Sequence, residues 1–292
     1  MTTVGDMFAG GGGWSLGATA AGCRVLWALE HGPAIAAVYA RNLGEHVICA
    51  DIQTVDPHDL PPVDLLLASP PCQAYSVARR SATTARNDAD LGDEVVRFVE
   101  ALHPKHVLVE NVPPYQHAPV FRRITDALST LGYWLHWSIE NAADYGVPQT
   151  RRRLILRATR AGLLAPLPEP LPWRGWYDAV ADLVPSMPVG ELAPWQQKRI
   201  KLPEGATAYL QQSNAYSDGL RYRTSGEPAF TITSQCGERS RIVVDGAGRQ
   251  LSGEAFYRLQ SFPDWYQGAT PRILGNAVPP RMAEALVRSM LQ

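Results

Sequence analysis

Short apolar segments alternate with helical segments through the first half of this chain, and this alternation restricts the possible folds more than any other feature. Strands are predicted at 3–9, 24–29, 46–50, 63–68, 105–110, 133–140 and 153–158, and helices at 14–21, 33–42, 91–102 and 120–131. Such alternation is typical of an α/β fold with a doubly wound, mostly parallel sheet covered by helices on both faces. Ligands of these sheets bind at the carboxyl ends of the strands.

A proline-rich segment ends this alternation. Residues 165–172 read Ala-Pro-Leu-Pro-Glu-Pro-Leu-Pro, and so much proline continues neither a helix nor a central strand. The chain from there to about residue 248 looks irregular, with many Pro, Gly, Gln and Ser residues and several aromatic ones. Periodicity returns in residues 279–292, which predict an amphipathic helix. We therefore expect a large α/β part and a smaller irregular part.

The overall charge gives no general signature of nucleic-acid binding. The formal net charge is -1 over 292 residues, so an enzyme of this sequence that acts on nucleic acid needs a local basic cleft. Most arginines are better explained as solvated surface charges. The candidates for a cleft are Arg79, Arg80, Arg86, Arg151, Arg152, Arg153, Arg221, Arg223, Arg239 and Arg241.

The cysteines and the N-terminus bear on the cellular compartment. Cys23, Cys49, Cys72 and Cys236 have no paired spacing, so we expect neither a metal site nor a redox pair. Free thiols fit a reducing cytosol. The sequence shows no signal-peptide pattern and no apolar stretch long enough for a membrane span. We expect a cytoplasmic protein.

A glycine-rich turn follows the first predicted strand, in the run Asp6-Met-Phe-Ala-Gly-Gly-Gly-Gly-Trp-Ser-Leu-Gly17. Such a turn lets the backbone approach a cofactor closely, although its spacing argues against a nicotinamide cofactor. Phe8 is a candidate to stack on an adenine ring, or else a core aromatic. Glu30 suits the hydroxyls of a ribose better than a helix dipole alone. Asp51 is either an acceptor for an adenine amino group or a cap.

The run Ser69-Pro70-Pro71-Cys72-Gln73 follows a strongly apolar strand. Two prolines stiffen the loop and can hold a thiol in a fixed attack geometry. Methylases of exocyclic amino groups carry a similar run with an aromatic residue in place of Cys72. Carbon 5 of cytosine is a poor nucleophile, but addition of a thiolate at carbon 6 activates it. We therefore predict that Cys72 is a nucleophile rather than a buried structural thiol.

Two further motifs supply polar partners. Glu110-Asn111-Val112 ends the next core strand, and a carboxyl group there would stabilise the intermediate at ring nitrogen 3 if Glu110 is partly desolvated. Alone, the pair would be interpreted as a helix cap. In Gln149-Thr150-Arg151-Arg152-Arg153, strand alternation would put Arg151 and Arg153 on one face. Two guanidinium groups there suit a pyrimidine carbonyl oxygen and a phosphate.

In this order the motifs resemble those of the cytosine-5 DNA methyltransferase family. The resemblance covers roughly residues 3–160 and 250–290 and continues with Arg258-Leu259-Gln260-Ser261-Phe262-Pro263-Asp264 and Gly275-Asn276-Ala277-Val278-Pro279. It implies a class I methyltransferase fold, which is Rossmann-like, and S-adenosylmethionine as methyl donor. It also implies a target-recognition domain at 161–261, with the catalytic and cofactor-binding domain at 1–160 plus 262–292.

The resemblance assigns roles to individual residues. The catalytic residues would be Cys72, Glu110, Arg151 and Arg153, with no metal. The cofactor-binding residues would be Phe8, Gly10, Gly12, Glu30, Asp51, Ile52, Pro70, Asn276 and Val278. The DNA-binding residues would be Gln73, Ser76 and Thr231, and candidates to read base edges are Gln211, Gln212, Asn214, Gln235 and nearby arginines. Residues 78–90, just after the nucleophile, are polar and small and are expected to form a lid.

The expected partners are duplex DNA, with the target base extruded, and a cognate restriction endonuclease acting on the same site; the protein itself is expected to be a monomer. The chain departs from the family where Glu254-Ala255 replaces the usual Arg-Glu. Two alternatives remain. One is a tRNA cytosine-5 methyltransferase of the same family, and the other is a catalytically silent binding protein of the same fold.

Overall fold

The computed structural model of this chain describes residues 1–71, 91–190, 207–213, 220–233 and 240–292. They form two compact units. Unit 1 comprises Met1–Asn141, Arg152–Glu169 and Pro280–Gln292, and unit 2 comprises Ala142–Arg151 and Pro170–Pro279. Within the described ranges, no helix is both long and apolar enough to span a membrane.

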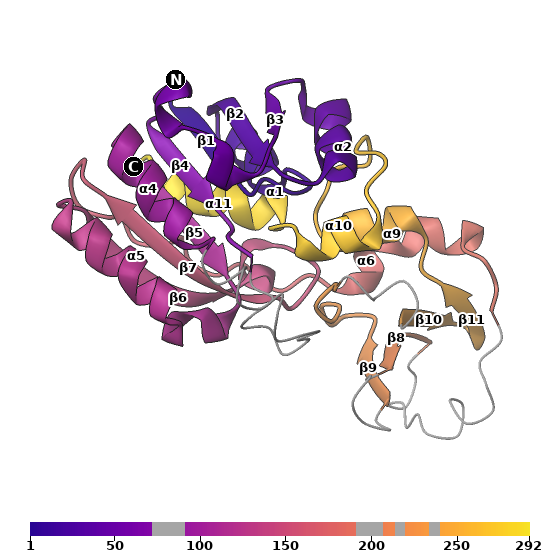
Figure 1. The fold of residues 1–292 in the computed structure, drawn as a ribbon. Helices are drawn as coiled ribbons and strands as arrows, with labels where there is room; N and C mark the ends of the chain where they lie inside the picture. The colour runs from indigo at the N-terminus through magenta and orange to yellow at the C-terminus, as the bar shows by residue number, and fades with distance from the viewer. Residues whose placement is uncertain (72–90, 191–206, 214–219, 234–239) are drawn as a thin grey trace. The chain divides into compact units, whose positions relative to one another are not determined.

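Unit 1 is built on a seven-stranded sheet in the order β3-β2-β1-β4-β5-β7-β6 (Figure 1). Its strands are β1 (Thr3–Met7), β2 (Arg24–Glu30), β3 (Val47–Cys49), β4 (Leu65–Ala68), β5 (His106–Asn111), β6 (Trp134–Asn141) and β7 (Arg152–Thr159). The strands from β3 to β5 pair in parallel, and β7 is antiparallel to both of its neighbours. The predicted fold, α/β with a mostly parallel sheet, is confirmed.

The order of the strands locates a crevice for ligands. From β1 the chain moves outward to β2 and β3, and then returns to place β4 on the other side of β1. The loops that leave β1 and β4 therefore diverge at the carboxyl edge of the sheet, which is where doubly wound sheets bind ligands. The glycine turn follows β1, and Ser69-Pro70 follows β4.

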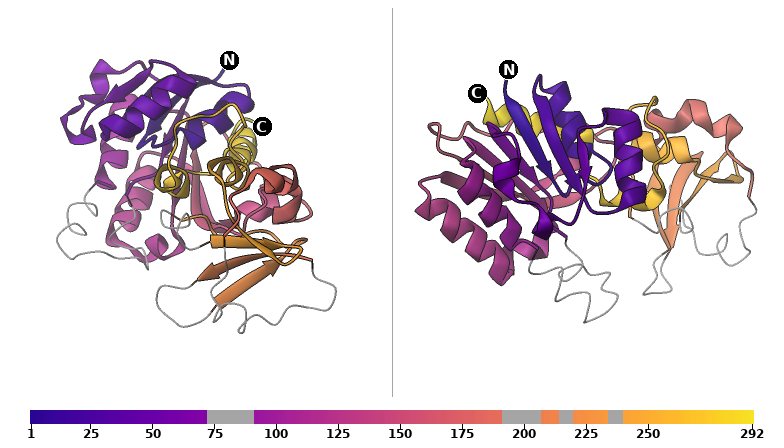
Figure 2. Two further views of the ribbon diagram at one scale, coloured as in Figure 1. Left: turned by 90° about the vertical axis from the view of Figure 1, so that its right-hand side faces the viewer. Right: turned by 45° about the horizontal axis from the view of Figure 1, so that its top comes forward.

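Helices cover the sheet of unit 1 (Figures 1 and 2). They are α1 (Gly13–Ala20), α2 (Pro33–Leu43), α4 (Asp93–Leu102), α5 (Pro119–Thr130) and α11 (Pro280–Met290). The C-terminal helix α11 packs on α1. The two helices approach closely at Gly17, where a Cβ atom would lie only 2.4 Å from Ala283 Cβ. Helix α4 packs on α5, and residues of both enter the main hydrophobic core with Met7, Leu66 and Val107.

Unit 2 is more regular than its sequence suggests. It contains α6 (Trp176–Val180), α9 (Gly253–Leu259), α10 (Pro271–Asn276) and an antiparallel sheet in the order β11-β10-β8-β9. The strands are β8 (Ala208–Ser213), β9 (Leu220–Thr224), β10 (Ser240–Val244) and β11 (Ala247–Gln250). A glutamine at a buried position of β8, Gln211, interrupts the apolar pattern of that strand. The β10–β11 hairpin turns at Asp245-Gly246, both with positive φ, a pairing that favours such turns.

Candidate active site

The turn after β1 contains two glycines that play different parts. Gly10 and Gly12 have φ of 53° and 71°, in the left-handed region that favours glycine. A side chain at Gly12 would collide with Leu43, 2.3 Å away, whereas one at Gly10 would meet only the Phe8 carbonyl at 3.9 Å. Packing therefore requires glycine at position 12, and the backbone at Gly10 is open to a ligand.

Glu30, at the end of β2, holds the turn in place. Its Oε2 accepts a hydrogen bond from the Gly10 amide at 3.0 Å, and its Oε1 accepts one from the Gly32 amide at 2.8 Å. The side chain is buried. The carboxylate therefore ties the glycine turn to the start of α2 and lies beside the open backbone at Gly10. This arrangement fits a ligand that brings hydroxyl groups, such as a ribose.

The other candidate cofactor residues of unit 1 lie at neighbouring strand ends. Phe8 is half-buried, has φ of 58° and packs against the main core. Asp51 is exposed and caps the short 3-10 helix Ile52–Thr54, since its Oδ1 accepts a hydrogen bond from the Gln53 amide at 3.1 Å. Ile52 is buried. Of the two roles that the sequence leaves open for Asp51, the structure shows the cap, and the described contacts engage only one of its two carboxylate oxygens.

A buried acid, Asp6, lies near the end of β1 beside this turn, in an environment that no sequence pattern indicates. Ser15 Oγ donates to Asp6 Oδ2 at 2.6 Å, and Tyr39 Oη donates to Ser15 Oγ at 2.7 Å. Asp6 is fully buried. Desolvation raises the pKa of Asp6 to about 7, against the opposing effect of the Ser15 hydrogen bonds.

The loop after β4 is anchored on both sides as far as Pro71. Trp14 Nε1, in α1, donates to Ser69 Oγ at 2.9 Å, and Asn111 Nδ2, at the end of β5, donates to the Pro70 carbonyl at 3.0 Å. Asn111 Oδ1 in turn accepts from the Val112 amide at 2.8 Å. These contacts hold the backbone that leads directly into Cys72. Cys72, Gln73 and Ser76 themselves lie outside the described residues, as does the expected lid at 78–90.

Glu110 immediately precedes Asn111, and its side chain is only about 5% exposed. Arg153 Nε donates to Glu110 Oε1 at 2.9 Å from the adjacent strand β7. Arg153 is itself largely buried, so the pair is shielded from solvent and held in a defined geometry. The desolvation expected for Glu110 is confirmed. The structure brings Glu110 and Arg153 together and joins Asn111 to the loop of Cys72.

Gln149 and Arg151 form hydrogen bonds within unit 2, whereas Arg153 pairs with Glu110 in unit 1. The Gln149 side chain is fully buried; its Nε2 donates to the Leu259 carbonyl and to Gln260 Oε1, and its Oε1 accepts from the Ile232 amide. Arg151, 1% exposed, donates to the carbonyls of Ile232, Gly275 and Ala277 at 3.0–3.1 Å. These contacts connect residues next to Thr231 with residues next to Asn276.

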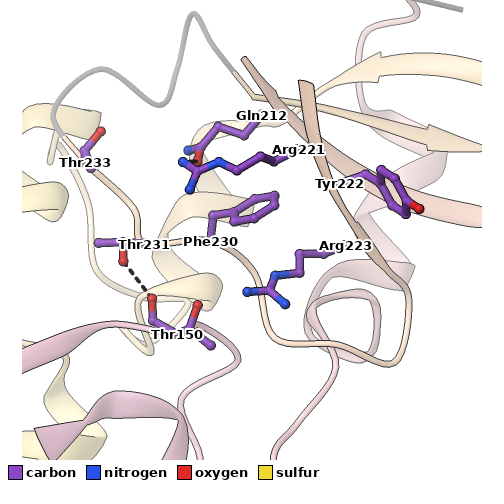
Figure 3. A pocket seen from close by; sticks show the side chains of 8 residues that line it. All are labelled: Thr150, Gln212, Arg221, Tyr222, Arg223, Phe230, Thr231 and Thr233. Atoms are coloured by element: carbon purple, nitrogen blue, oxygen red, sulfur yellow. Dashed lines mark hydrogen bonds between the residues drawn. The ribbon is translucent and has the colours of Figure 1, made fainter. Parts of the chain in front are cut away.

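Thr231 lies at the rim of a pocket in unit 2. Its Oγ1 donates to the Thr150 carbonyl at 2.7 Å. The pocket has a volume of about 530 Å³ and is lined by Thr150, Gln212, Arg221, Tyr222, Arg223, Phe230, Thr231 and Thr233 (Figure 3). Phe230, for which the sequence offered no role beyond its neighbour Thr231, provides an aromatic surface here. The recognition candidates Asn214 and Gln235 fall outside the described residues.

The last motif residues belong to unit 2. Asn276 ends α10 with an exposed side chain, and Val278 is buried. At the family's usual Arg-Glu position, Glu254 is exposed and Ala255 is buried in α9. Further along α9, Arg258 forms ion pairs with Asp182 and Asp264. Arg258 therefore stabilises this helix with charges of its own unit.

Known proteins resemble the chain along its whole length. The family model of C-5 cytosine-specific DNA methylases matches residues 2–178. The Type II methyltransferase M.HaeII of Haemophilus aegyptius is 29% identical over 297 residues, which cover 98% of this chain and 92% of the relative. The Type II methyltransferase M.AplI of Arthrospira platensis is 30% identical over 300 residues, covering 98% and 84%. A prophage protein of E. coli, provisionally described as a DNA modification methyltransferase, superimposes with a TM-score of 0.73 at 21% identity, covering 100% and 99%.

Proposed function

The chain belongs to the C-5 cytosine-specific DNA methylase family, and we propose that it methylates carbon 5 of a cytosine extruded from duplex DNA through a covalent Cys72 adduct. One observation carries this proposal: Asn111 donates to the Pro70 carbonyl at 3.0 Å. This bond ties the backbone two residues before Cys72 to the residue that follows Glu110. It supports a site in which a nucleophile and a carboxyl group address the same base.

In the proposed reaction, Cys72 Sγ attacks carbon 6 of the cytosine as a thiolate and forms a carbon–sulfur bond. The electron pair of the 5,6 double bond becomes available at carbon 5, while Glu110, as a carboxylic acid, donates its proton to ring nitrogen 3 and neutralises the negative charge that develops there. S-adenosylmethionine, when bound, would supply the methyl group for carbon 5 and would leave as S-adenosylhomocysteine. Ring nitrogen 3 then returns its proton to Glu110, and loss of the carbon 5 proton to water expels the Cys72 thiolate and restores the aromatic ring.

The surrounding residues have supporting parts in this scheme. Arg153 orients the Glu110 carboxyl group through their 2.9 Å ion pair and can also approach the base. Gly10 and Glu30 fit the methyl donor, because the open backbone at Gly10 accommodates close approach and the carboxylate suits ribose hydroxyls. We propose that Phe8, Gly12, Asp51, Ile52, Pro70, Asn276 and Val278 complete the cofactor site, and that Gln73, Ser76 and Thr231 act on the base or the DNA backbone. Because Arg151 is buried and donates to the carbonyls of Ile232, Gly275 and Ala277, we propose that it positions the segment of Thr231 and does not touch the DNA itself.

We further propose that residues 161–261 recognise the target sequence, with 1–160 and 262–292 as the catalytic domain. We propose duplex DNA as the substrate, which the Type II methyltransferase relatives support. We also propose the cytoplasm as the compartment and a restriction endonuclease that acts on the same site as a partner. The enzyme is proposed to act as a monomer, since one target base and one methyl donor meet in a single chain.

The proposal is tested with labelled S-adenosylmethionine, duplex DNA and tRNA, using the purified chain. Label should enter carbon 5 of cytosine in DNA, and DNA that contains 5-fluorocytosine should form an adduct that survives denaturation and maps to the Cys72 peptide. Cys72→Ser should abolish both outcomes while binding of S-adenosylmethionine persists. Cys49→Ser, which replaces an exposed free thiol, should change neither. Incorporation into tRNA alone, or near-normal activity of Cys72→Ser, would overturn the proposal.

A further inference from the structure

The pocket beside Thr231 is made by one face of the small sheet. Successive residues of a strand point to opposite faces, so Arg221 and Arg223 of β9 share a face and Tyr222 points away, as Figure 3 shows. Gln212 of β8 is the direct register partner of Arg221. Directly paired residues lie on the same face, so Gln212 and Arg221 stand side by side over the pocket.

The two arginines both stack on Phe230. The guanidinium carbons of Arg221 and Arg223 lie 5.2 Å and 5.0 Å from the centre of its ring. Figure 3 shows the ring between the two guanidinium groups. Because Phe230 is itself 9% exposed and fixed by its own burial, both guanidinium groups are held against one rigid aromatic ring.

The two arginines differ in which of their hydrogen-bond donors remain for a ligand. Arg223 Nη1 is bound to Glu227 Oε1 at 2.9 Å, and the other Glu227 oxygen accepts from the amide and hydroxyl of Thr224. Although partial burial works in the other direction, the hydrogen bonds from Thr224 and Arg223 lower the pKa of Glu227. Glu227 therefore stays ionised near neutral pH and neutralises Arg223. Arg223 supports the stack.

Arg221 has no comparable partner among the described residues. It is exposed, and its one hydrogen bond there is a long one, 3.5 Å from Nη2 to Gln212 Oε1. Its contact with the Phe230 ring and its hydrogen bond to Gln212 restrict the position of the guanidinium group. The other N–H groups of its guanidinium fork make no hydrogen bond to a described residue. A planar pair of donors held in this way is suited to two acceptors in one plane.

We propose that Arg221 reads a guanine in the recognised DNA site by donating to its O6 and N7 atoms. This inference rests on the proposed function, since it requires duplex DNA as substrate. Guanine presents two adjacent acceptors in the major groove, whereas adenine presents an acceptor beside a donor, and arginine has only donors. A phosphate contact needs no fixed plane, because phosphate oxygens accept from many directions. The stacked geometry therefore favours the base edge over the backbone.

The test begins with the intact protein and its own target sequence, obtained by bisulfite sequencing of DNA that it has methylated. Duplexes of that sequence are then made in which each guanine in turn is replaced by 7-deazaguanine, which lacks the N7 acceptor. At one position the replacement should lower kcat/KM of the wild-type enzyme by at least about 5-fold. This arm needs no variant and does not depend on how a variant folds.

Variants connect that effect to the residue. Arg221→Ala should lower kcat/KM on unmodified DNA by roughly 10- to 100-fold and should lose its sensitivity to 7-deazaguanine at that position. Arg221→Lys, which keeps the charge but not the planar fork, should behave similarly. Arg241→Ala removes the same charge from the opposite face of the sheet, since Arg241 pairs with Gln211, and it should keep the sensitivity.

Three results would overturn the inference. One is a wild-type enzyme indifferent to 7-deazaguanine at every position, and another is an Arg221→Ala enzyme that keeps the wild-type sensitivity. The third is a uniform loss of affinity for all sequences with a salt dependence reduced by about one ion, which identifies a phosphate contact. Failure of the wild-type enzyme to methylate any DNA would instead refute the proposed function.

Discussion

The buried amide of Gln149 offers a direct test of how unit 2 is held together. Its side chain makes three hydrogen bonds, to the Leu259 carbonyl, to Gln260 Oε1 and from the Ile232 amide. Leucine has a similar volume but can make none of them. Gln149→Leu therefore leaves three buried polar groups without their partner at a site from which water is excluded.

The expected loss follows from those three groups. Each buried donor or acceptor left unsatisfied costs about 1–3 kcal/mol, and removal of the glutamine amide itself returns part of this because the amide no longer has to be desolvated. The net effect should be a decrease of roughly 3 to 5 kcal/mol in the free energy of unfolding of unit 2. That is a large fraction of the stability of a typical domain.

Gln211→Leu is the matched control. Gln211 belongs to the same unit and is equally buried, but its Oε1 has no hydrogen-bond partner among the described residues. Replacement by leucine removes an amide oxygen that is already unsatisfied, so stability should change by less than about 1 kcal/mol or rise. The two variants thus make the same chemical change and differ only in the hydrogen bonds lost.

Hydrogen exchange measured by mass spectrometry over a urea series gives the required readout. Peptides that contain Ile232 should lose protection in Gln149→Leu, and those from β4 and β5 of unit 1 should keep theirs. The Ile232 amide is the sharpest probe, because Gln149 is its acceptor. Equal stabilities of the Gln149→Leu and Gln211→Leu proteins would refute the reasoning, as would undisturbed protection at Ile232.

Three other perturbations test unit 1. Gly12→Ala should destabilise the fold by about 2 kcal/mol or more, because Leu43 occupies the space that the new methyl group needs. Gly10→Ala should mainly weaken binding of S-adenosylmethionine. Thermal melting measures the first effect and titration calorimetry the second, and equal losses of stability and of binding in the two variants would contradict these expectations. Gly17→Val should push α1 away from α11 and lower the melting temperature. Gly253→Ala should leave the melting temperature unchanged, because a Cβ atom at Gly253 would have no neighbour within 4 Å. The pKa of Asp6 is raised to about 7 in the folded protein, so between about pH 4 and pH 7 the folded state retains a proton that the unfolded chain has lost. The free energy of unfolding should therefore fall as the pH rises through this range, by up to roughly 1.4 kcal/mol per pH unit. Asp6→Asn should flatten that dependence in urea titrations, and an unchanged slope would show that another group is responsible.

Much of unit 1 was predictable because its elements are specified locally. Apolar segments of four to eight residues define the strands, and the proline at residue 33 marks the start of α2 as expected. Strand direction was less accessible. The chain between β6 and β7 holds only the 3-10 helix Ala142–Tyr145, too little for a parallel crossover, yet this is visible only once the ends of the strands are known.

The candidate site was predictable in its parts and less so in its connections. Motif spacing identified Glu110 and Arg153, and the structure pairs them. No local pattern indicates that Asn111 reaches the Pro70 carbonyl, or that Phe230 contacts Arg221 and Arg223 of the preceding strand β9. The first contact joins segments 41 residues apart, and the second depends on how the loop after β9 folds back on that strand. Side-chain periodicity determines neither.

The run from Gln149 to Arg153 illustrates why a motif should be resolved residue by residue. Gln149 and Arg151 hold backbone carbonyls and amides within unit 2, whereas Arg153 pairs with Glu110 in unit 1, and the chain passes from one unit to the other between Arg151 and Arg152. A loss of activity in Gln149 or Arg151 variants would therefore have to be separated from a loss of order in unit 2. Arg153→Met does not carry that ambiguity, because it leaves the hydrogen bonds of unit 2 intact and removes only the partner that orients Glu110. If Glu110 acts on ring nitrogen 3 as proposed, Arg153→Met should lower kcat far more than it lowers stability.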